Sequence, residues 1–418
     1  MIDGFRRRPT SKFVHPAAQH VATHAVIGGN AQPAPAFKPP EVIAAEENSP
    51  ANAAPPEPHK KRSFKAWLAA RTKKQWIIFA VVAVLVLAGG GVGLFKVLHH
   101  KKPVAVSHAV TKKVVTPPKP TTVANDLTGR QVDPSINLRP VTAVMIENSE
   151  DARPQSGLDQ AGVVFEAVAE GGITRFVALF QDTAPAYIGP VRSVRPYYEQ
   201  WLLGFDAPVA HVGGSAEALA NMGPWGIKDL DQFYNSATYH RISSRYAPHN
   251  VYTSMDELNA LETKKGYTSS KFTPLARKAE APFKTPVASS IDLTISSAFF
   301  NVHYDYDSTT NSYKRSEGGA AHMELNQDGS QVQITPKVVV ALVLQQGIAA
   351  DDLHTSYTAT GSGAVYIFQD GNVITGSWHK ASNNENFTFT DASGAAIKLN
   401  PGQTWFTAVN ATSHVAYK

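Results

Sequence analysis

The longest apolar run in the chain extends from residue 76 to residue 98 and reads WIIFAVVAVLVLAGGGVGLFKVL, with Lys96 as its single charge. A helix of about 20 apolar residues crosses the hydrocarbon core of a bilayer, so this run predicts one transmembrane helix in contact with membrane lipid. Three consecutive glycines, Gly89 to Gly91, are compatible with a membrane helix, although they would weaken a soluble one. A buried core helix is the alternative, but core helices seldom lack polar residues over this length.

The segments on either side of this apolar run differ in charge. Seven Lys and Arg residues lie within residues 60–74, whereas three, Lys96, Lys101 and Lys102, lie at or just after the C-terminal end of the run. This excess predicts a cytoplasmic N-terminus and extracytoplasmic C-terminal domains. We expect a disordered, Ala- and Pro-rich cytoplasmic tail at residues 1–60, a basic juxtamembrane segment at 61–75, the transmembrane helix at 76–98 and a Pro/Thr-rich stalk at 99–124.

Short apolar runs rich in β-branched residues recur within residues 125–283, the first predicted folded domain. Such runs, bounded by turn residues, predict strands, and stretches with helical spacing predict helices. Ser254 and Glu257 form a capping box at the start of one helix. The interspersed elements predict a mixed α/β domain, with strands at 141–146, 163–168, 175–180 and 207–211 and helices at 197–203, 216–222 and 254–261.

Residues 284–418 have a different pattern and form the second predicted domain. The dipeptides Asp328-Gly329 and Asp370-Gly371 each lie between alternating or β-branched runs, which is typical of β-hairpins. Only a short turn near residues 349–353 interrupts the β pattern. This domain is predicted to be mostly β, as a sheet or open barrel, so the fold class is α+β, with further strands at 338–344, 387–390 and 404–409.

The net charge of +5 is divided unevenly along the chain. Residues 1–119 carry 18 Lys and Arg against 5 Asp and Glu, whereas residues 120–418 carry 21 against 29. The folded part is therefore mildly acidic, and we expect no nucleic-acid partner. The chain contains no cysteine, so neither disulfides nor a lipid-modified cysteine can be formed.

The densest charge in the first domain lies around a glycine pair, Gly171-Gly172. If these two residues form a two-residue hairpin loop, Glu166 faces Val177 and Val168 faces Arg175 across the strands. Arg175 would then lie on one face with Glu166 and Glu170, and the opposite face would enter the core. The arrangement is either a structural ion-pair network or the polar floor of a ligand pocket.

Two further arginines follow this hairpin. Arg192 and Arg195 are three residues apart, and Gly189-Pro190 is expected to start a helical turn that places both on one side. Two guanidinium groups near a helix N-terminus favour binding of a carboxylate or phosphate, although a solvated pair of arginines is the alternative.

Other polar candidates follow in loops. The turn His211-Val-Gly-Gly-Ser215 joins a predicted strand to a predicted helix, and the amides of Gly213 and Gly214 could bind an oxyanion. Ser215 could instead simply cap the helix. His249 and Asn250 lie in a turn after Arg241 and Arg245, where a polar cluster requires no function.

A hydrolase could use Glu166 or Glu170 as acid or base, or Ser215 with His211 or His249. The sequence contains no Gly-x-Ser-x-Gly, His-Glu-x-x-His or Walker motif. The histidine spacings do not match a common zinc site, so we predict no metal and no cofactor.

A set of short motifs is spread over residues 139–405. They are Arg139-Pro140, Ile146-Glu-Asn148, Arg153-Pro-Gln-Ser-Gly157, Glu170-Gly-Gly-Ile-Thr-Arg175-Phe, Gly189-Pro-Val-Arg-Ser193, His211-Val-Gly-Gly-Ser215, Pro248-His-Asn-Val-Tyr-Thr-Ser254, Gly361-Ser-Gly363, Gly376-Ser-Trp378 and Leu399-Asn-Pro-Gly-Gln-Thr-Trp405. Together these motifs resemble the YerB-like family of bacterial envelope proteins. The resemblance implies a two-part domain of unknown function and an envelope location, and it implies no reaction. Members of that family look typically like lipoproteins, whereas this chain has no cysteine and is expected to have a transmembrane helix instead.

The expected function is binding of a polar or anionic cell-envelope ligand, such as a peptidoglycan fragment, by a membrane-anchored extracytoplasmic protein. An envelope hydrolase using Glu166, Glu170 or His211 and a protein–protein scaffold are the alternatives, and no oligomeric state is predicted. Glu166 and Glu170 are the expected supporting ion-pair partners, and the expected ligand-binding residues are Arg175, Arg192, Arg195, His211, Gly213, Gly214, Ser215, His249 and Asn250.

Overall fold

The computed structural model describes residues 121–418 of the chain. Among these residues, no helix combines the length and the apolar character needed to cross a bilayer. The predicted tail, juxtamembrane segment and transmembrane helix, and all but the last residues of the predicted stalk, lie outside the described residues.

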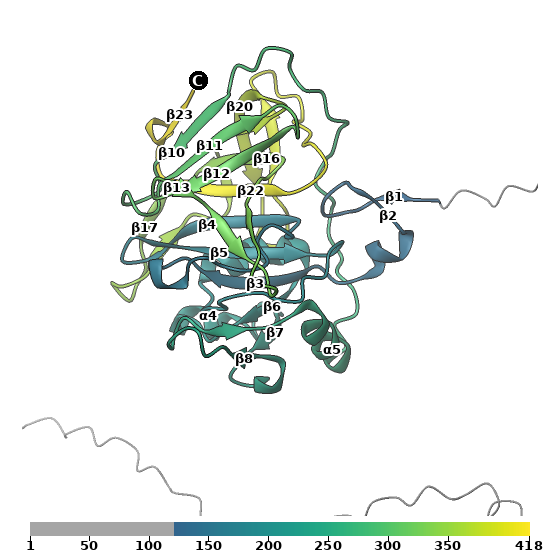
Figure 1. Cartoon of the computed structure of the whole chain (residues 1–418), viewed down its shortest axis with the longest axis vertical. Helices are drawn as coiled ribbons and strands as arrows, with labels where there is room; N and C mark the ends of the chain where they lie inside the picture. Colours follow the sequence, from purple (N-terminus) through teal and green to yellow (C-terminus); the bar gives the residue numbers. More distant parts are fainter. Residues whose placement is uncertain (1–120) are drawn as a thin grey trace, which may run out of the picture. The chain divides into compact units, whose positions relative to one another are not determined.

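One ten-stranded mixed sheet runs through the described part of the chain (Figure 1). Its centre is a parallel pair in which β22 lies beside β4, with Thr404 opposite Val163 and Thr407 opposite Glu166. The two predicted domains therefore share one sheet, and the domain boundary at residue 283 stays a prediction. In order across the sheet, the strands are β21 (Thr388–Asp391), β20 (Asn372–Lys380), β19 (Gly361–Gln369), β16 (Val338–Val343), β22 (Thr404–Val409), β4 (Val163–Glu170), β5 (Ile173–Phe180), β3 (Thr142–Glu147), β6 (Pro208–His211) and β7 (Lys228–Asp231).

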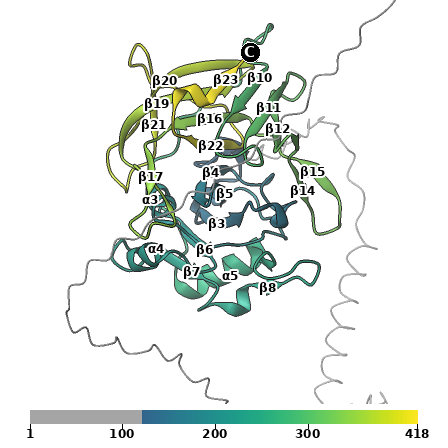
Figure 2. The same ribbon diagram turned by 90° about the vertical axis from the view of Figure 1, so that its left-hand side faces the viewer.

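Residues 121–283 are called the first half below, and residues 284–418 the second half. The first half covers its part of this sheet with short helices. Strands β3, β6 and β7 are mutually parallel, and the helices that connect or follow them lie on both faces. Tyr197 and Trp201 of α3 pack against Met145 on one face, whereas Leu258 of α5 packs with Ile146 on the other. Figure 2 shows α4 and α5 on either side of β6 and β7. The helices are α3 (Pro196–Leu202), α4 (Ala216–Asn221) and α5 (Met255–Lys265).

A second, five-stranded antiparallel sheet packs on the part of the large sheet that comes from the second half of the chain. Ile291 and Tyr304 of the smaller sheet share a buried cluster with Val339 and Phe368 of the larger one. This half is thus mostly β, as the sequence predicts. In order across the smaller sheet, the strands are β13 (Ala320–Ala321), β12 (Ser312–Glu317), β11 (Val302–Asp307), β10 (Ser290–Leu293) and β23 (Val415–Tyr417).

Four two-stranded hairpins and five 3₁₀ turns complete the described residues. The hairpins are β1 (Val123–Ala124) with β2 (Gln131–Val132), β8 (His240–Arg241) with β9 (Val251–Tyr252), β14 (Met323–Leu325) with β15 (Gln331–Gln333), and β17 (Gln346–Ile348) with β18 (Thr355–Tyr357). The 3₁₀ turns are Pro134–Leu138, Glu150–Ala152, Leu203–Phe205, Ser236–Thr238 and Thr412–His414.

Local sequence signals predicted the helices and most strands of the large sheet, whereas no strand of the smaller sheet was predicted individually. Ser254 caps α5 by accepting a hydrogen bond from the amide of Glu257 at 3.2 Å, as the capping box requires. Asp370 and Gly371 join β19 to β20 with φ angles of 59° and 71°, the positive values that a type I′ turn demands. The Asp328-Gly329 hairpin is confirmed as β14 and β15.

The predicted register of the β4–β5 hairpin is wrong beyond its first pair. Glu170 faces Ile173 as expected, but a bulge between Val168 and Glu170 places Glu166 opposite Phe176 and Ala167 opposite Arg175. Because side chains alternate along a strand, this shift of one residue puts Glu166 and Arg175 on opposite faces of the sheet. Both faces are buried here, so the apolar pattern could not reveal the bulge.

The helical turn predicted at Gly189-Pro190 is also wrong. Residues 188–194 are extended, with Val191 bridging Ile146. The helix begins at the next proline, Pro196, and Arg195 is its N-cap residue. Pro196 occupies the first turn of the helix, where proline is favoured. Pro190 and Pro196 were both candidates for this position, and the pairing of Val191 with Ile146 keeps the segment around Pro190 extended.

Candidate functional site

Polar side chains gather where the parallel strands of the first half end. Glu147 ends β3, His211 ends β6 and Asp231 ends β7. The strand pairings place all three on the face that α3 and α4 cover. In open α/β sheets, ligands bind beyond the carboxyl ends of the strands, so this edge is the candidate site.

Glu147 contacts three polar side chains at this edge, and it was not among the predicted site residues. Its Oε1 accepts a hydrogen bond from Ser149 Oγ at 2.9 Å and lies 2.9 Å from His249 Nδ1 and 3.3 Å from Arg192 Nε. Its Oε2 is buried and has no hydrogen-bond partner among residues 121–418. The sequence signal that could have identified Glu147 is its position directly after the predicted strand at residues 141–146.

Arg192 combines a fixed backbone with a partly exposed guanidinium group. Its amide donates to Met145 O at 3.0 Å, and its carbonyl accepts from Val212 N at 3.1 Å. Within the described chain, Glu147 is the only charged partner of its side chain, which is 23% exposed. The terminal guanidinium nitrogens are therefore available to an anion. The neighbouring His249 side chain is 22% exposed, and its Nε2 has no partner within the same residues.

Glu170 forms ion pairs with Arg175 and Arg195, the other two arginines that were predicted to bind a ligand. Arg175 Nη2 donates to its Oε1 at 2.5 Å, and Arg195 Nη2 donates to its Oε2 at 2.6 Å. Burial alone would raise the pKa of Glu170, but the two guanidinium groups outweigh burial and hold that pKa below its usual value. Each arginine also donates to a backbone carbonyl, of Ser193 and Val194 respectively. Glu170 thus orients Arg175 as predicted, but both arginines are buried and internally bonded.

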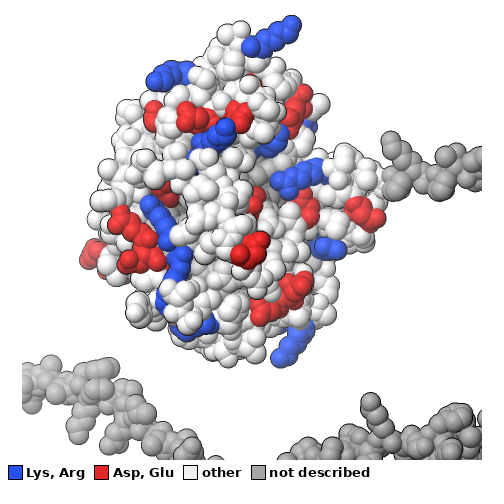
Figure 3. All heavy atoms as spheres, in the orientation of Figure 1, with Lys and Arg blue, Asp and Glu red and all other residues white. Residues whose placement is uncertain are grey.

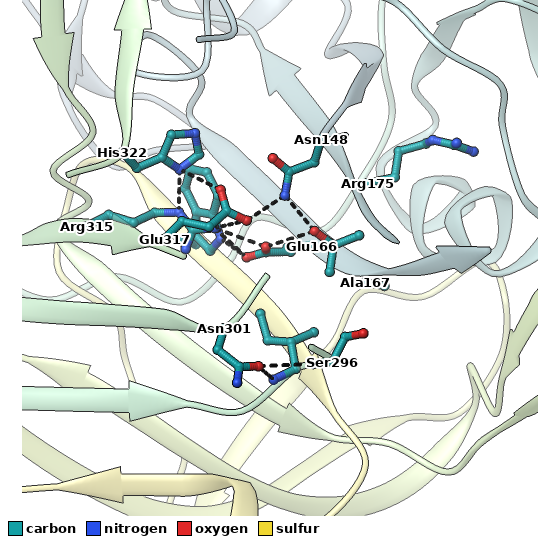
Figure 4. Close-up of polar contacts among 12 residues, drawn as sticks. Asn148, Glu166, Ala167, Arg175, Ser296, Asn301, Arg315, Glu317 and His322 are labelled. Carbon is teal, nitrogen blue, oxygen red and sulfur yellow. Dashed lines mark hydrogen bonds and ion pairs between the residues drawn. The ribbon is translucent and has the colours of Figure 1, made fainter. Parts of the chain in front are cut away.

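Glu166 lies on the opposite face and does not contact Arg175. Its carboxylate oxygens accept from Arg315 Nη2 at 3.0 and 3.1 Å, and its Oε2 also accepts from Trp405 Nε1 at 3.0 Å. Figure 4 shows Glu166 among residues of the second half, with Arg175 set apart. The expectation that Glu166 supports Arg175 is therefore wrong, because the bulge turned its side chain to the other face.

The network around Arg315 is enclosed (Figure 4). Arg315 Nε donates to His322 Nδ1 at 2.8 Å, so that this nitrogen must be unprotonated. Burial and the adjacent Arg315 hold the pKa of His322 well below its usual range. Burial raises the pKa of Glu317 to about 7, although Arg315 opposes this effect. The network pairs buried polar groups at the junction of the two halves, although Glu317 Oε2 has no hydrogen-bond partner within residues 121–418.

His211 and the glycine turn are occupied by local bonds. His211 is fully buried, with Nδ1 2.8 Å from Gly213 O and Nε2 3.1 Å from Asp229 Oδ1. The Gly213 amide, expected to serve a ligand, donates to Asp231 Oδ1 at 3.0 Å. Gly214 is half-buried beside this bond.

Ser215 and Asn250 have structural contacts. Ser215 caps α4 by accepting from the amide of Ala218 at 3.4 Å. Asn250 accepts from Arg241 Nη1 at 2.6 Å and donates to the carbonyls of Ile242 and Arg245, which closes the loop of the β8–β9 hairpin. Of the nine expected ligand-binding residues, the structure brings Arg192 and His249 together at Glu147, each with a partly exposed side chain.

The residues considered for hydrolysis lack a catalytic arrangement. Glu170 and Glu166 are both paired with arginine, and a carboxylate held in this way is a poor general base. Ser149 Oγ lies 3.2 Å from His249, but it approaches Nδ1, the same nitrogen that Glu147 contacts. A Ser–His–acid relay uses the two ring nitrogens separately. Residues 121–418 contain no group of three or more side chains suited to holding a metal ion.

The surface charge is mixed. Figure 3 shows Lys and Arg side chains interspersed with Asp and Glu over the face that it displays.

Comparisons with known proteins cover most of the described chain. The family described as "Protein of unknown function (DUF3048) N-terminal domain" matches residues 127–268, and the corresponding C-terminal domain matches residues 291–406. The chain is 32% identical over 293 residues to "Putative lipoprotein YerB" of Bacillus subtilis (strain 168), covering 68% of this chain and 85% of that protein. It is also similar to the crystal structure of YerB protein from Bacillus subtilis, with a TM-score of 0.63 and 28% identity, covering 71% of this chain and 99% of that one.

Proposed function

This chain belongs to the DUF3048 family of proteins of unknown function, and we propose that it is an envelope protein that binds an anionic ligand at Arg192 and His249. The observation that carries the proposal is the partly exposed guanidinium group of Arg192. It lies at the carboxyl edge of the sheet on a fixed backbone, next to a buried carboxylate that engages one side of it.

The chemistry of this pair favours a carboxylate or phosphate group. A guanidinium group presents parallel N–H donors that match either anion, and the imidazole adds a neighbouring nitrogen. Glu147 contacts both Arg192 and His249 and restrains their side chains. Less side-chain entropy is therefore lost when these two residues bind a ligand. A peptidoglycan fragment is the proposed ligand, because its peptide stems carry carboxylates.

The proposed location is the outer face of a cell membrane. The relative from Bacillus subtilis is named as a lipoprotein, which associates that protein with the envelope. This chain has no cysteine to carry a lipid, and its apolar run at residues 76–98 would anchor it instead. The cationic excess before that run supports an inside N-terminus and an outside C-terminal part.

The test is retention of the full-length protein, reconstituted in lipid nanodiscs, by purified peptidoglycan. The Arg192→Ala variant should lose at least about tenfold in retention, since hydrogen bonds to charged groups contribute roughly 1.5–3 kcal/mol. Its free energy of unfolding should fall by no more than about 3 kcal/mol, because the buried Glu147 loses Arg192 but keeps its contacts with His249 and Ser149.

Arg130→Ala is the matched control. Arg130 is also a partly exposed arginine with a single carboxylate partner, Asp182 at 3.4 Å, but it lies away from the site. This variant should retain peptidoglycan as the parent protein does. Equal retention by the Arg192→Ala variant, or undiminished retention by peptidoglycan whose carboxylates have been amidated, would refute the proposal.

A further inference from the structure

A ligand-sized cavity lies where the connecting segment of the two halves passes a loop of the second half. Its volume is about 640 Å³, within the range of small-molecule pockets. Gly204, just after α3, forms part of its wall. Apolar side chains form much of the remainder, namely Phe272, Leu275, Phe387, Phe389, Ile397 and Leu399.

A smaller and more polar cavity adjoins the first. Its volume is about 270 Å³, and it shares Lys271 and Asn384 with the larger cavity as lining residues. Glu199 of α3 lines it, as does Asp206, which pairs with Lys228 at 2.8 Å. That pair neutralises itself, and among the lining residues the buried carboxyl with an unbonded oxygen is Glu199, whereas the Lys271 side chain is exposed.

Glu199 has an unfilled hydrogen-bonding position. Its Oε2 accepts from Asn221 Nδ2 at 3.2 Å, whereas its Oε1 is buried and has no partner within residues 121–418. Burial raises the pKa of Glu199 to about 8, so the carboxyl carries a proton at neutral pH and can donate as well as accept. In the larger cavity, Asn386 Oδ1 is likewise buried without a partner in the described chain.

Buried polar atoms in native proteins are nearly always bonded, and an unbonded one requires an explanation. Here Glu199 and Asn386, each with one buried and unbonded oxygen in the described chain, are lining residues of adjoining cavities, the larger of which has an apolar wall. A ligand with a hydroxyl group at Glu199 and an apolar chain beyond it would satisfy both the polar and the apolar surfaces.

We propose that the two adjoining cavities form a binding site for one amphiphilic molecule, with its apolar chain in the larger cavity and an uncharged, hydroxyl-bearing head at Glu199. An anionic head at Glu199 would meet the Asp206 carboxylate, and the exposed Lys271, which lines both cavities, is the one lysine there without a carboxylate partner in residues 121–418. An ammonium head would require Glu199 to lose its proton in a buried position. This site is separate from Arg192 and does not depend on the function proposed above.

The experiment uses photo-crosslinking of the full-length protein in lipid nanodiscs. The probe is a monoacylglycerol with a diazirine in its acyl chain, and the cross-linked peptides are mapped by mass spectrometry. We expect labelling within residues 271–276 and 384–399. Matched probes that carry a carboxylate or an ammonium head on the same chain should label these segments at least about fivefold less.

Three variants locate the ligand. Ala276 and Ala396 are exposed residues on the cavity wall, so Ala276→Trp and Ala396→Trp should each reduce labelling at least about fivefold without entering the core. Ala392→Trp adds the same bulk at an exposed position outside the lining and should leave labelling unchanged.

Glu199→Gln removes the acidic proton and should weaken the preference for the hydroxyl head while the chain still binds. Labelling that persists in both wall variants would overturn the site. Equal labelling by all three heads in the parent protein would overturn the role of Glu199.

Discussion

Glu166 illustrates how a single residue can acquire its role from distant sequence. It is fully buried, and its charged partner Arg315 lies 149 residues further along the chain. No local pattern links these two positions, whereas Glu170 and Arg175 are five residues apart in one hairpin and could be paired from the sequence. The distance along the chain, rather than the residue type, decided which ion pair was predictable.

The Glu166–Arg315 pair predicts a large cost for removing one partner. Arg315→Met should lower the free energy of unfolding by about 3–5 kcal/mol, because Glu166 would be left charged in the interior. Adding Glu166→Gln should recover part of that loss. Chemical denaturation measures both, and Lys314→Met, on an exposed side chain of the same strand, serves as the control. A change below about 1 kcal/mol in Arg315→Met would contradict the buried-pair interpretation.

Glu199 should make the free energy of unfolding fall as the pH rises. Its pKa is about 8 in the folded protein against an ordinary value of 4.5. Between these pH values the folded protein retains a proton that the unfolded chain has released, so the free energy of unfolding falls as the pH rises. The slope should be up to about 1.4 kcal/mol per pH unit.

Glu199→Gln isolates this contribution. The variant lacks the titrating group, so its free energy of unfolding should decline less steeply between about pH 4.5 and pH 8. Asn221 would still find a hydrogen-bonding side chain, and the nearby Glu217 and Asp229 are unchanged. Denaturation curves over this range that run parallel for the two proteins would show that Glu199 is not the group responsible.

At the scale of elements, the β4–β5 hairpin shows the limit of a periodic pattern. The turn at Gly171-Gly172 and both strands were predictable, because glycines punctuate two β-branched runs. The bulge between Val168 and Glu170 was not, because every residue of β4 before Glu170 is buried. Alternation identifies a register only when one face meets water.

The edge strand β21 depends on a glycine in the strand beside it. A Cβ on Gly376 would lie 2.0 Å from the carbonyl oxygen of Thr390, closer than any real contact. Gly376→Ala should therefore displace β21, lower the free energy of unfolding by about 1–3 kcal/mol and accelerate hydrogen exchange of the β21 amides. Gly223→Ala, which meets no atom within 4 Å, should change stability by less than about 0.5 kcal/mol. Unchanged exchange in β21 would show that the strand accommodates the methyl group.

At the scale of the whole molecule, the shared sheet joins the two halves into one folding unit. The β4–β22 pair crosses between them, and Glu166 receives Arg315 and Trp405 from the second half. We expect residues 121–418 to unfold in one cooperative transition, and residues 121–283 alone to lack a cooperative transition. Calorimetry of the full protein and of this fragment distinguishes the alternatives. Two separate transitions, or a natively folded fragment, would show that the halves are independent.

The absence of cysteine makes the proposed topology testable with single-cysteine variants. A membrane-impermeant maleimide applied to intact cells should label the Ser393→Cys variant, since Ser393 is exposed on the folded part. The Ser11→Cys variant should be labelled only after the cells are lysed. Labelling of Ser11→Cys in intact cells would reverse the orientation inferred from the cationic excess.

The sequence by itself determined the elements of this protein whose causes are local. Turn dipeptides, capping residues and runs of β-branched residues act over a few positions, so they predicted the Asp370-Gly371 hairpin, the start of α5 and the change from mixed α/β to mostly β. Only the tertiary structure decided that both halves share one sheet, that Glu166 turns toward Arg315, and that Arg192 and His249 meet at Glu147. These features depend on strand pairings between distant segments. Such pairings are stabilised by surfaces and charges that come together only in the folded structure, so the order of neighbouring residues does not reveal them.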